Sequence, residues 1–447
     1  MATETPITSL QVYKDPSLLV GKAILVHNPT TGDGMAFAAD SLVQTAKDLS
    51  MFTTEGASRG SQTTANSYIV RAPGVYKFPL VYGNGLKNGI TNTAAYTRVV
   101  SDYTAQFVNH LGNAISSPYI EKNANCQASS AALLWQTDSG MISSVSLIDE
   151  GDCKYIHFTV ASIPATNGIA SFVVKNSSGT IVWSWYIWLT SDDLTPITFT
   201  NSSNVSYRLM SENLFAIWNA GRTMYYCPHF QWGRKDPMKP LNGSGSQMTV
   251  YDINGNTYSG HGVLGTDSDE SEDKTVANAI QNPNLFFTRH NSTNHNWNNL
   301  SWFNNFWNAA MTSSSSLADD DDSTIKTIYD PCPPDWKMPS GRAFTWASTT
   351  GTNTTDSTQF NVVGSWSSGW YFKRNSFDTV GAFFPASGFR GYGSGSLDGI
   401  GSYGGYWSSA PGSQTNARGL YFYSGGVYPL VGSGRSYGFA VRPLREL

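Results

Sequence analysis

The chain has 447 residues and a formal net charge of −4, and its composition is rich in aromatic residues (13%) and poor in charged ones (13%). This length is enough for two or three domains with separate cores, and the aromatic content together with 42 glycines is typical of a mainly β protein. Lys and Arg form no cluster that would attract nucleic acid, and no apolar stretch reaches the length of a membrane span, so neither nucleic-acid binding nor membrane insertion is expected.

Residues 1–60 are expected to form a small leader region. Within it, the apolar run 23–26 predicts a short strand that ends at the turn-forming residues after it. Residues 39–46 predict a short helix with Asp40 or Ser41 as its N-cap. The first residues lack a basic segment followed by an apolar run, so either a signal sequence has been removed or the protein is made and assembled in the cytoplasm.

Residues 61–200 predict a β-sandwich module. Short runs of alternating apolar and polar residues are separated by turn residues, which is typical of an antiparallel β-sandwich. The last run contains four aromatic residues, Trp183, Trp185, Tyr186 and Trp188, which are expected to pack in the core rather than form a platform for sugars. The expected strands include 68–70, 75–78, 154–160, 170–174 and 181–188.

The same module contains a histidine and two cysteines with more than one interpretation. His157 lies among apolar residues and is expected to be a half-buried structural histidine rather than a ligand. Cys126 and Cys153 could bridge two neighbouring strands or remain free buried thiols. The four cysteines of the chain lack the paired short spacing of a zinc site, so no zinc is expected.

Residues 205–447 are the largest expected unit, an α+β domain with a loop-rich middle. Residues 300–307 predict an amphipathic helix. The run Asp319 to Asp322 offers the carboxylates that calcium prefers, but consecutive side chains cannot all converge on one ion. A solvated loop without a metal ion is therefore expected there.

The final segment, 404–447, places Tyr, Ser, Gly, Asn and Arg between regularly spaced apolar residues. Alternation in the run 420–423 sends its Leu and Phe to one side of a strand and its two tyrosines to the other. No lysine follows Lys373, which is unusual for a generic solvated surface, although such tyrosines also cover the edges of ordinary β domains. The residues expected to point inward are Trp407, Ala417, Leu420, Phe422, Val427, Phe439 and Val441.

This composition predicts a ligand-binding face. Antibody combining sites use the same residue types, because tyrosine combines a large amphipathic ring with few rotatable bonds. The candidate ligand-binding residues are Tyr403, Tyr406, Ser413, Thr415, Asn416, Arg418, Gly419, Tyr421, Tyr423, Tyr428, Leu430, Val431, Ser433 and Tyr437.

Six motifs follow one another along residues 205–447: Tyr226–Pro237, Ala279–Pro283, Tyr329–Pro339, Phe384–Gly388, Tyr406–Ser409 and Gly438–Pro443. Together they resemble the Bacteroidetes major paralogous domain, which is related to the C-type lectin fold. The stretches 65–84 and 179–190 are similar to β modules that accompany this domain in bacterial surface proteins. The resemblance implies a C-type lectin-like fold. The family often has a cysteine where this chain has Pro443, so no disulfide is expected for Cys332.

The C-terminal segment also resembles the variable region of proteins diversified by retroelements. In such systems, randomised adenines in asparagine-type codons yield Tyr, Ser, Gly, Val, Leu, Arg or Thr, but not Lys, Glu, Met or Trp. The outward positions here nearly all obey this limit, and Gln414 departs from it. The resemblance implies that these side chains bind ligands on a C-type lectin-like scaffold.

Residues 20–46 resemble the start of phage tail-fibre proteins. This resemblance implies that the N-terminal region attaches to phage tail or baseplate proteins, that the chain is a homotrimer, and that it is located in the virion. The expected function is a host-recognition adhesin that binds a bacterial surface receptor, either glycan or protein. The alternative is an exported Bacteroidetes adhesin of the cell surface or a fimbrial tip.

Enzyme activity is not expected. Cys227 and Cys332 lie in proline-flanked loops, and no His and carboxylate set has the spacing of a triad. His290 and His295 are expected on a loop surface, and the short calcium-binding motifs of lectins do not occur. The sequence therefore predicts no catalytic residue, metal or cofactor, and an enzyme with an unrecognised site remains a third alternative.

Overall fold

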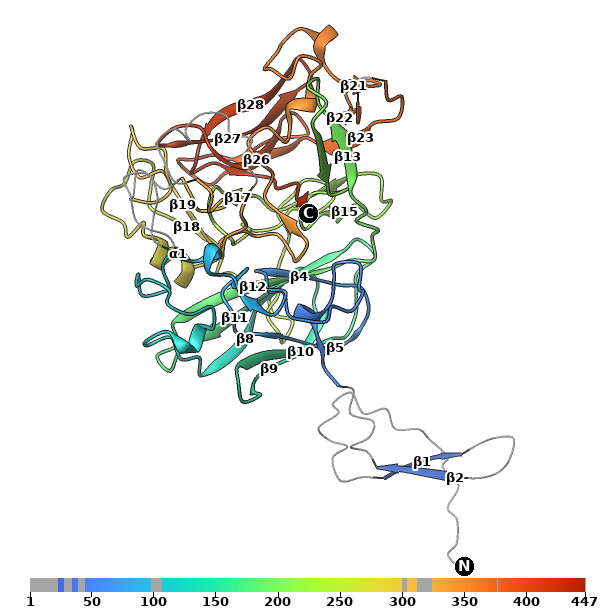
Figure 1. The fold of residues 1–447 in the computed structure, drawn as a ribbon, viewed down its shortest axis with the longest axis vertical. Coiled ribbons are helices and arrows are strands. Elements are labelled where there is room, and N and C mark those ends of the chain that lie inside the picture. The colour runs from blue at the N-terminus through green and yellow to red at the C-terminus, as the bar shows by residue number, and fades with distance from the viewer. Residues whose placement is uncertain are drawn as a thin grey trace, which may run out of the picture. The chain divides into compact units, whose positions relative to one another are not determined.

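The computed structural model describes residues 45–97, 107–299, 304–311, 324–375 and 377–446, and the backbone of two strands in the leader. The chain forms two compact units, Met1–Lys47 and Asp48–Leu447. In the first unit, β1 (Ala23–His27) pairs antiparallel with β2 (Gly34–Ala38), as Figure 1 shows. The predicted strand at 23–26 is thus confirmed. Of the helix predicted at 39–46, residues 39–44 lie outside the described residues, and the last two, Thr45 and Ala46, are not helical.

Residues 48–60, which the sequence assigned to the leader, pack in the second unit. Leu49 is buried in the main hydrophobic core. Trp336 Nε1 donates a hydrogen bond of 3.1 Å to Thr54 Oγ1, and Arg59 forms an ion pair with Asp335. Both contacts join this short stretch to residues almost 300 positions later in the chain.

The N-terminal half of the second unit is a β-sandwich. Its two sheets face each other through aromatic rings: Phe172 lies 6.2 Å from Phe78 and 4.8 Å from Phe158 between ring centroids. The predicted β-sandwich is therefore confirmed, although β4 and β12 pair in parallel. The first sheet has the order β3 (Lys47–Asp48), β5 (Gly74–Pro79), β10 (Lys154–Val160), β9 (Ile142–Asp149), and the second has the order β4 (Ser67–Val70), β12 (Ile181–Leu189), β11 (Gly168–Lys175), β8 (Ser130–Gln136).

The aromatic run of β12 is covered on both faces. Trp183, Trp185, Tyr186 and Trp188 are all at most 1% exposed, which confirms them as core residues. The Trp185 ring packs inside the sandwich, 5.4 Å from the Phe78 ring, while Tyr186 OH donates to Asp236 on the other side. A strand buried on both faces needs no polar alternation, which explains its continuous apolar sequence.

The histidine and the cysteines of the sandwich are structural. His157 is partly buried, and its Nε2 lies 2.7 Å from Glu150 Oε1. All four cysteines are free, so the bridge considered between Cys126 and Cys153 does not form, and Cys332 has no disulfide either.

The C-terminal half is built from three sheets and several strand pairs, coloured from green to red in Figure 1. The largest sheet has the order β17 (Phe230–Gln231), β29 (Gly438–Phe439), β24 (Ser387–Arg390), β26 (Gly404–Pro411), β27 (Asn416–Tyr423), β28 (Gly426–Gly434), with β25 (Leu397–Ile400) paired to β24. The smaller sheets are β13 (Ile197–Thr200), β14 (Ser206–Leu209), β30 (Leu444–Arg445), β20 (Trp336–Lys337), and β21 (Val362–Val363), β22 (Gly369–Phe372), β23 (Ala382–Pro385). The strand pairs of this half are β15 (Ile217–Trp218) with β16 (Tyr225–Tyr226), and β18 (Gly262–Leu264) with β19 (Leu285–Phe287). A further pair, β6 (Leu86–Lys87) with β7 (Ile90–Thr91), belongs to the N-terminal half.

Helical structure is scarce, so the fold is mainly β. The described residues contain one α-helix, α1 (Val276–Gln281), whose N-cap Thr275 accepts a hydrogen bond from the backbone of Asn278. Short 3-10 turns occur at Leu49–Met51, Thr93–Ala95, Ile120–Lys122, Thr345–Ala347 and Ser357–Gln359. None of the described helices could span a membrane.

The helix predicted at 300–307 is wrong for its described part. Residues 304–307 form an irregular segment, and 300–303 lie outside the described residues. Phe306 and Trp307 are both buried although they are adjacent, and their rings contact Trp232. The apolar residues that the sequence analysis assigned to one face of a helix thus belong to a loop that is buried on both sides.

The two halves of the second unit share one core. Lys235 and Asp236, next to β17, form a buried ion pair of 2.6 Å, and the Asp236 carboxylate also accepts hydrogen bonds from Ser184 and Tyr186 of β12. The main hydrophobic cluster runs from Leu49 in the first half to residues of β29 in the second. The sandwich is therefore packed directly against the C-terminal half.

Candidate ligand-binding face

The strands β26, β27 and β28 form an antiparallel meander in which β26 is buried on both sides and β27 alternates between buried and partly exposed residues. Leu420 and Phe422 of β27 are fully buried, whereas Tyr421 and Tyr423 are half-buried on the opposite side. The alternation predicted from the sequence is therefore confirmed. All seven residues predicted to point inward are at most 3% exposed.

Four tyrosines gather on the outer side of this meander. We call Tyr403, Tyr421, Tyr423 and Tyr428 the tyrosine cluster. The rings of Tyr403 and Tyr421 stack with centroids 5.6 Å apart, and Tyr423 lies 5.9 Å from Tyr403 and 6.2 Å from Tyr428. Tyr421 and Tyr428 are direct cross-strand partners, which places both rings on the same face. The sequence thus predicted side chains that the fold brings together.

Glycine makes room for the cluster. A Cβ on Gly426 would lie 2.7 Å from both the Tyr423 and Tyr428 rings. The two tyrosine hydroxyls come within 3.5 Å of each other. Burial raises the pKa of Tyr421, and the hydrogen bond with Tyr423 raises that of Tyr428. The hydroxyls of Tyr421 and Tyr428 therefore stay neutral near pH 7, and each can both donate and accept hydrogen bonds.

A concave pocket adjoins the cluster at Tyr421. We call this cavity of about 390 Å³ the Tyr421 pocket. It brings together five residues of the predicted site, Asn416, Tyr421, Val431, Ser433 and Tyr437. It also contains residues that the sequence interpretation did not include, namely His295, Phe389, Gly432, Gly434 and Phe439.

Tyr392 extends this aromatic surface beyond the pocket. Its ring stacks on His295 with centroids 5.6 Å apart and contacts the Tyr437 ring at 4.9 Å. The Arg289 guanidinium lies 4.6 Å over the same ring and pairs with Asp267. His295 was predicted on a loop surface, and the structure places it at the wall of the pocket. The Gly, Tyr and Ser composition around Tyr392 was the sequence signal that could have extended the site.

Two predicted site residues lie in the interior and are corrected here. Tyr406 is fully buried, and its hydroxyl donates a hydrogen bond of 2.7 Å to Pro385 O. Tyr406 pairs with Leu420 across the strands, so both point toward the core. Gly419 is buried, and a Cβ there would lie 2.2 Å from Tyr406 O, so this position admits no side chain.

The remaining predicted residues surround the turn between β26 and β27 and the strand β28. The Ser413 hydroxyl accepts from the backbone of Thr415 and Asn416, and thereby fixes this turn. Arg418 is half-buried and donates to Leu430 O at 2.9 Å. Leu430 is also half-buried. Arg418 therefore ties neighbouring strands together.

A buried arginine that the sequence interpretation did not identify supports the same turn. Arg435 is 1% exposed, stacks 4.4 Å over the Trp232 ring, and donates to Ser413 O and Asn416 O. Burial lowers its pKa to about 9. Arg435 thus positions the turn without being part of the exposed face.

The cysteines and a histidine of the C-terminal half are buried away from the tyrosine cluster. Burial raises the pKa of the Cys227 thiol to about 12 and that of Cys332 well above its ordinary value, so neither thiol is an activated nucleophile. Burial also lowers the pKa of His229 to about 3. Within the described ranges, no three His, Cys, Asp or Glu side chains are placed to hold a metal ion, and Asp319 to Asp322 lie outside them.

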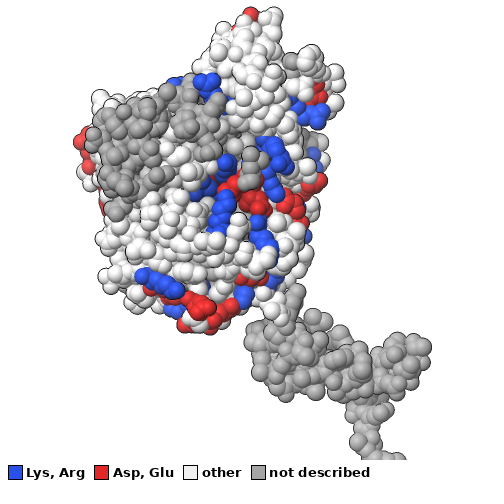
Figure 2. Space-filling model, in the orientation of Figure 1, with Lys and Arg blue, Asp and Glu red and all other residues white. Residues whose placement is uncertain are grey.

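The charge distribution shows no single-sign patch on the visible face. Figure 2 shows Lys and Arg side chains intermixed with Asp and Glu, with wide uncharged areas between them. A nucleic-acid-binding surface would instead gather positive charge.

One comparison with known proteins gives a match. Residues 343–444 match a family model described as a domain of unknown function (DUF8237). The matched residues include the whole tyrosine cluster and the strands that carry it. No curated protein and no solved structure matches the chain.

Proposed function

We propose that this protein is a host-recognition adhesin whose tyrosine cluster and Tyr421 pocket bind a molecule on a bacterial surface, either a glycan or a protein. The convergence of four tyrosine rings on one side of a sheet carries this proposal, because the opposite side of the sheet is buried. The backbone under the rings is therefore held in place before a ligand arrives. Such preorganisation reduces the entropy lost on binding.

The geometry supports recognition of a small unit of a larger receptor. The pocket volume of about 390 Å³ lies in the range of about 300–1,000 Å³ that is usual for small-molecule sites. Tyrosine rings supply apolar contact area and their hydroxyls supply hydrogen bonds, a combination suited to sugars and to protein surfaces.

We further propose that the face is diversified on a C-type lectin-like scaffold. Outward side chains such as Tyr421 and Tyr423 alternate with the buried residues Leu420 and Phe422. Replacing an outward side chain therefore leaves the core unchanged. Gly419 is an exception, because its position has no space for a side chain.

The attachment and assembly of the adhesin are part of the same proposal. The N-terminal region would join the chain to a phage tail, and a homotrimer with many copies per particle would multiply a weak affinity by about 10² to 10⁴. An exported bacterial adhesin would use the same face. The coding neighbourhood separates the two: phage structural genes, a reverse transcriptase and a template copy accompany the first only.

Cell adsorption by the purified chain tests the binding proposal. We expect Tyr421→Ala combined with Tyr423→Ala to abolish saturable adsorption to host cells and to leave the unfolding midpoint nearly unchanged, because both rings are partly exposed. Tyr371→Ala is the matched control, since Tyr371 is 46% exposed on β22 and lies outside the cluster. Normal adsorption by the double variant, or equal loss in the control, would refute the proposed binding face.

A further inference from the structure

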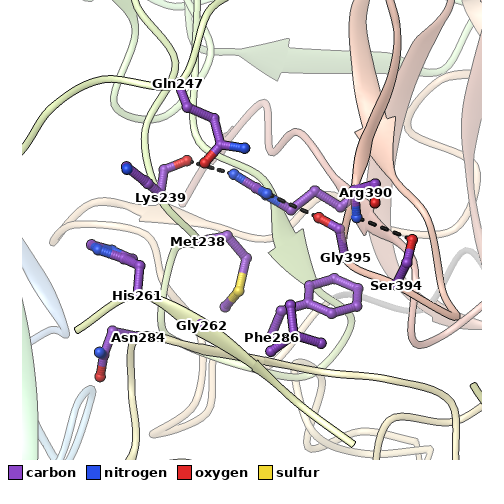
Figure 3. Close-up of a pocket in the computed structure, with 12 residues that line it drawn as sticks. Met238, Lys239, Gln247, His261, Gly262, Asn284, Phe286, Arg390, Ser394 and Gly395 are labelled. Atoms are coloured by element: carbon purple, nitrogen blue, oxygen red, sulfur yellow. Dashed lines mark hydrogen bonds between the residues drawn. The ribbon is translucent and has the colours of Figure 1, made fainter. Parts of the chain in front are cut away.

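A second cavity lies beside β24, separate from the tyrosine cluster. Phe389 and Arg390 are neighbours on this strand; Phe389 lines the Tyr421 pocket and Arg390 lines the second cavity. We call this cavity of about 290 Å³ the Arg390 pocket. In Figure 3, Arg390 reaches across it toward the Lys239 backbone, near Met238 and Phe286.

Arg390 carries a buried charge without an acidic partner among the described residues. It is 5% exposed, and its guanidinium donates to Gly395 O at 3.0 Å and to Lys239 O at 2.9 Å. Its Nε is buried and has no partner within the described part of the chain. The residues that line the pocket include no Asp or Glu. A buried cation is costly when it is bonded only to neutral carbonyls.

His261 also lines this pocket, and both of its ring nitrogens are buried and have no partner among the described residues. Its ring contacts Trp135 at 5.3 Å and Tyr258 at 5.7 Å between centroids, which fixes its orientation. Burial, and then the charges of Lys239 and Arg390, lower the pKa of His261 to about 3. The ring is therefore neutral at pH 7 and offers one donor and one acceptor.

Lys239 adds a second positive charge. Its side chain is half-buried, and its ammonium has no hydrogen-bond or ion-pair partner in the ranges that the structure describes. Two cations and a neutral imidazole thus surround a cavity whose other walls include the apolar side chains of Met238 and Phe286. Such a site matches a compact molecule with an oxyanion on one side and an apolar or ring surface on the other.

We propose that the Arg390 pocket binds a small organic anion, a carboxylate or phosphate monoester on a body about the size of one sugar. The oxyanion would accept hydrogen bonds from Arg390 and Lys239, and the body would contact Met238 and Phe286. The volume of about 290 Å³ lies just below the range of about 300–1,000 Å³ that is usual for small-molecule sites, which favours a single sugar unit.

Calorimetric titration of the full chain tests this site with four probes: glucuronate, glucose 6-phosphate, glucose and inorganic phosphate. We expect at least one of the two sugar anions to bind more tightly than both glucose and inorganic phosphate. The two sugar anions distinguish a carboxylate from a phosphate source. Sugar anions that bind no better than glucose or inorganic phosphate would overturn the proposal.

Two variants locate the binding. Lys239→Met should lower the affinity for the sugar anion by roughly tenfold or more, since it removes a charged donor. Ser394→Trp should block the pocket at its exposed rim. Lys175→Met and Ser177→Trp, at the end of β11 and in the following turn, are the matched controls and should bind normally. Unchanged binding in both pocket variants would also overturn the proposal.

This test is independent of the adhesin proposal. The double variant of Tyr421 and Tyr423 should bind the sugar anion normally, because neither residue lines the Arg390 pocket. Loss of cell adsorption and loss of anion binding can therefore be observed separately.

Discussion

At the scale of single residues, two tyrosines on neighbouring strands have opposite roles. Tyr421 is half-buried at the ligand face, whereas Tyr406, on the adjacent strand, is in the core. The reason is that Tyr406 pairs with Leu420 and that β26 is covered on both sides. The sequence analysis predicted Tyr406 outward and Trp407 inward, but both are buried, because alternation alone does not show that both faces of a central strand are covered.

A buried carboxyl group, that of Glu212, makes the stability of the folded protein depend on pH. Burial, and then the nearby carboxylate of Asp192, raise the pKa of Glu212 from 4.5 to about 8. Between these values the folded protein holds a proton that the unfolded chain releases, so the stability that this proton contributes is complete below about pH 4.5 and is lost as pH rises through about 8.

The variant Glu212→Gln should remove this pH dependence, because the amide cannot ionise. We expect urea unfolding to show that wild-type stability falls between about pH 5 and 8 more than that of the variant, which becomes the more stable protein at the upper end. Parallel pH profiles for the two proteins would contradict this explanation.

At the scale of elements, strands rich in β-branched and aromatic residues were predictable and enclosed loops were not. The runs predicted at 154–160 and 181–188 correspond to β10 and β12, because β-branched and aromatic residues favour extended structure. The pocket residues His295 and Phe389 were not predicted, since they come from segments that only the tertiary fold brings to β27. No pattern within the final segment contains that information.

The meander predicts which of its glycines can accept a side chain. Gly419→Ser should destabilise the protein by about 1–3 kcal/mol or more, because a Cβ there would meet the backbone of β26 at 2.2 Å. Gly432→Ser should be nearly neutral, since nothing lies within 4 Å of its Cβ position. Urea unfolding of the two variants measures the difference, and equal stabilities would show that the strands separate more easily than the structure implies.

At the scale of the whole molecule, residues 48–447 form one compact unit in which the sandwich and the C-terminal half share a core. The Asp236 carboxylate lies at their junction, where it accepts from Lys235, Ser184 and Tyr186. The sandwich therefore supports the sheet that carries the tyrosine cluster.

Removing this carboxylate should weaken both halves together. We expect Asp236→Ala to cost about 3–5 kcal/mol, because the buried Lys235 ammonium loses its acidic partner and keeps only the neutral Ser184. Unfolding of residues 48–447 should remain a single transition when circular dichroism and tryptophan fluorescence are compared. Two separate transitions would show that the halves fold independently.

The most direct measurement of the central claim is adsorption by a chain in which three outward tyrosines are exchanged together, as Tyr421→Ser, Tyr423→Ser and Tyr428→Asn. The buried residues beneath them are unchanged, so the free energy of unfolding should stay within about 1 kcal/mol per substitution. We predict that adsorption to the original host is lost while the fold is kept. Adsorption at the original level by the folded triple variant would contradict the account.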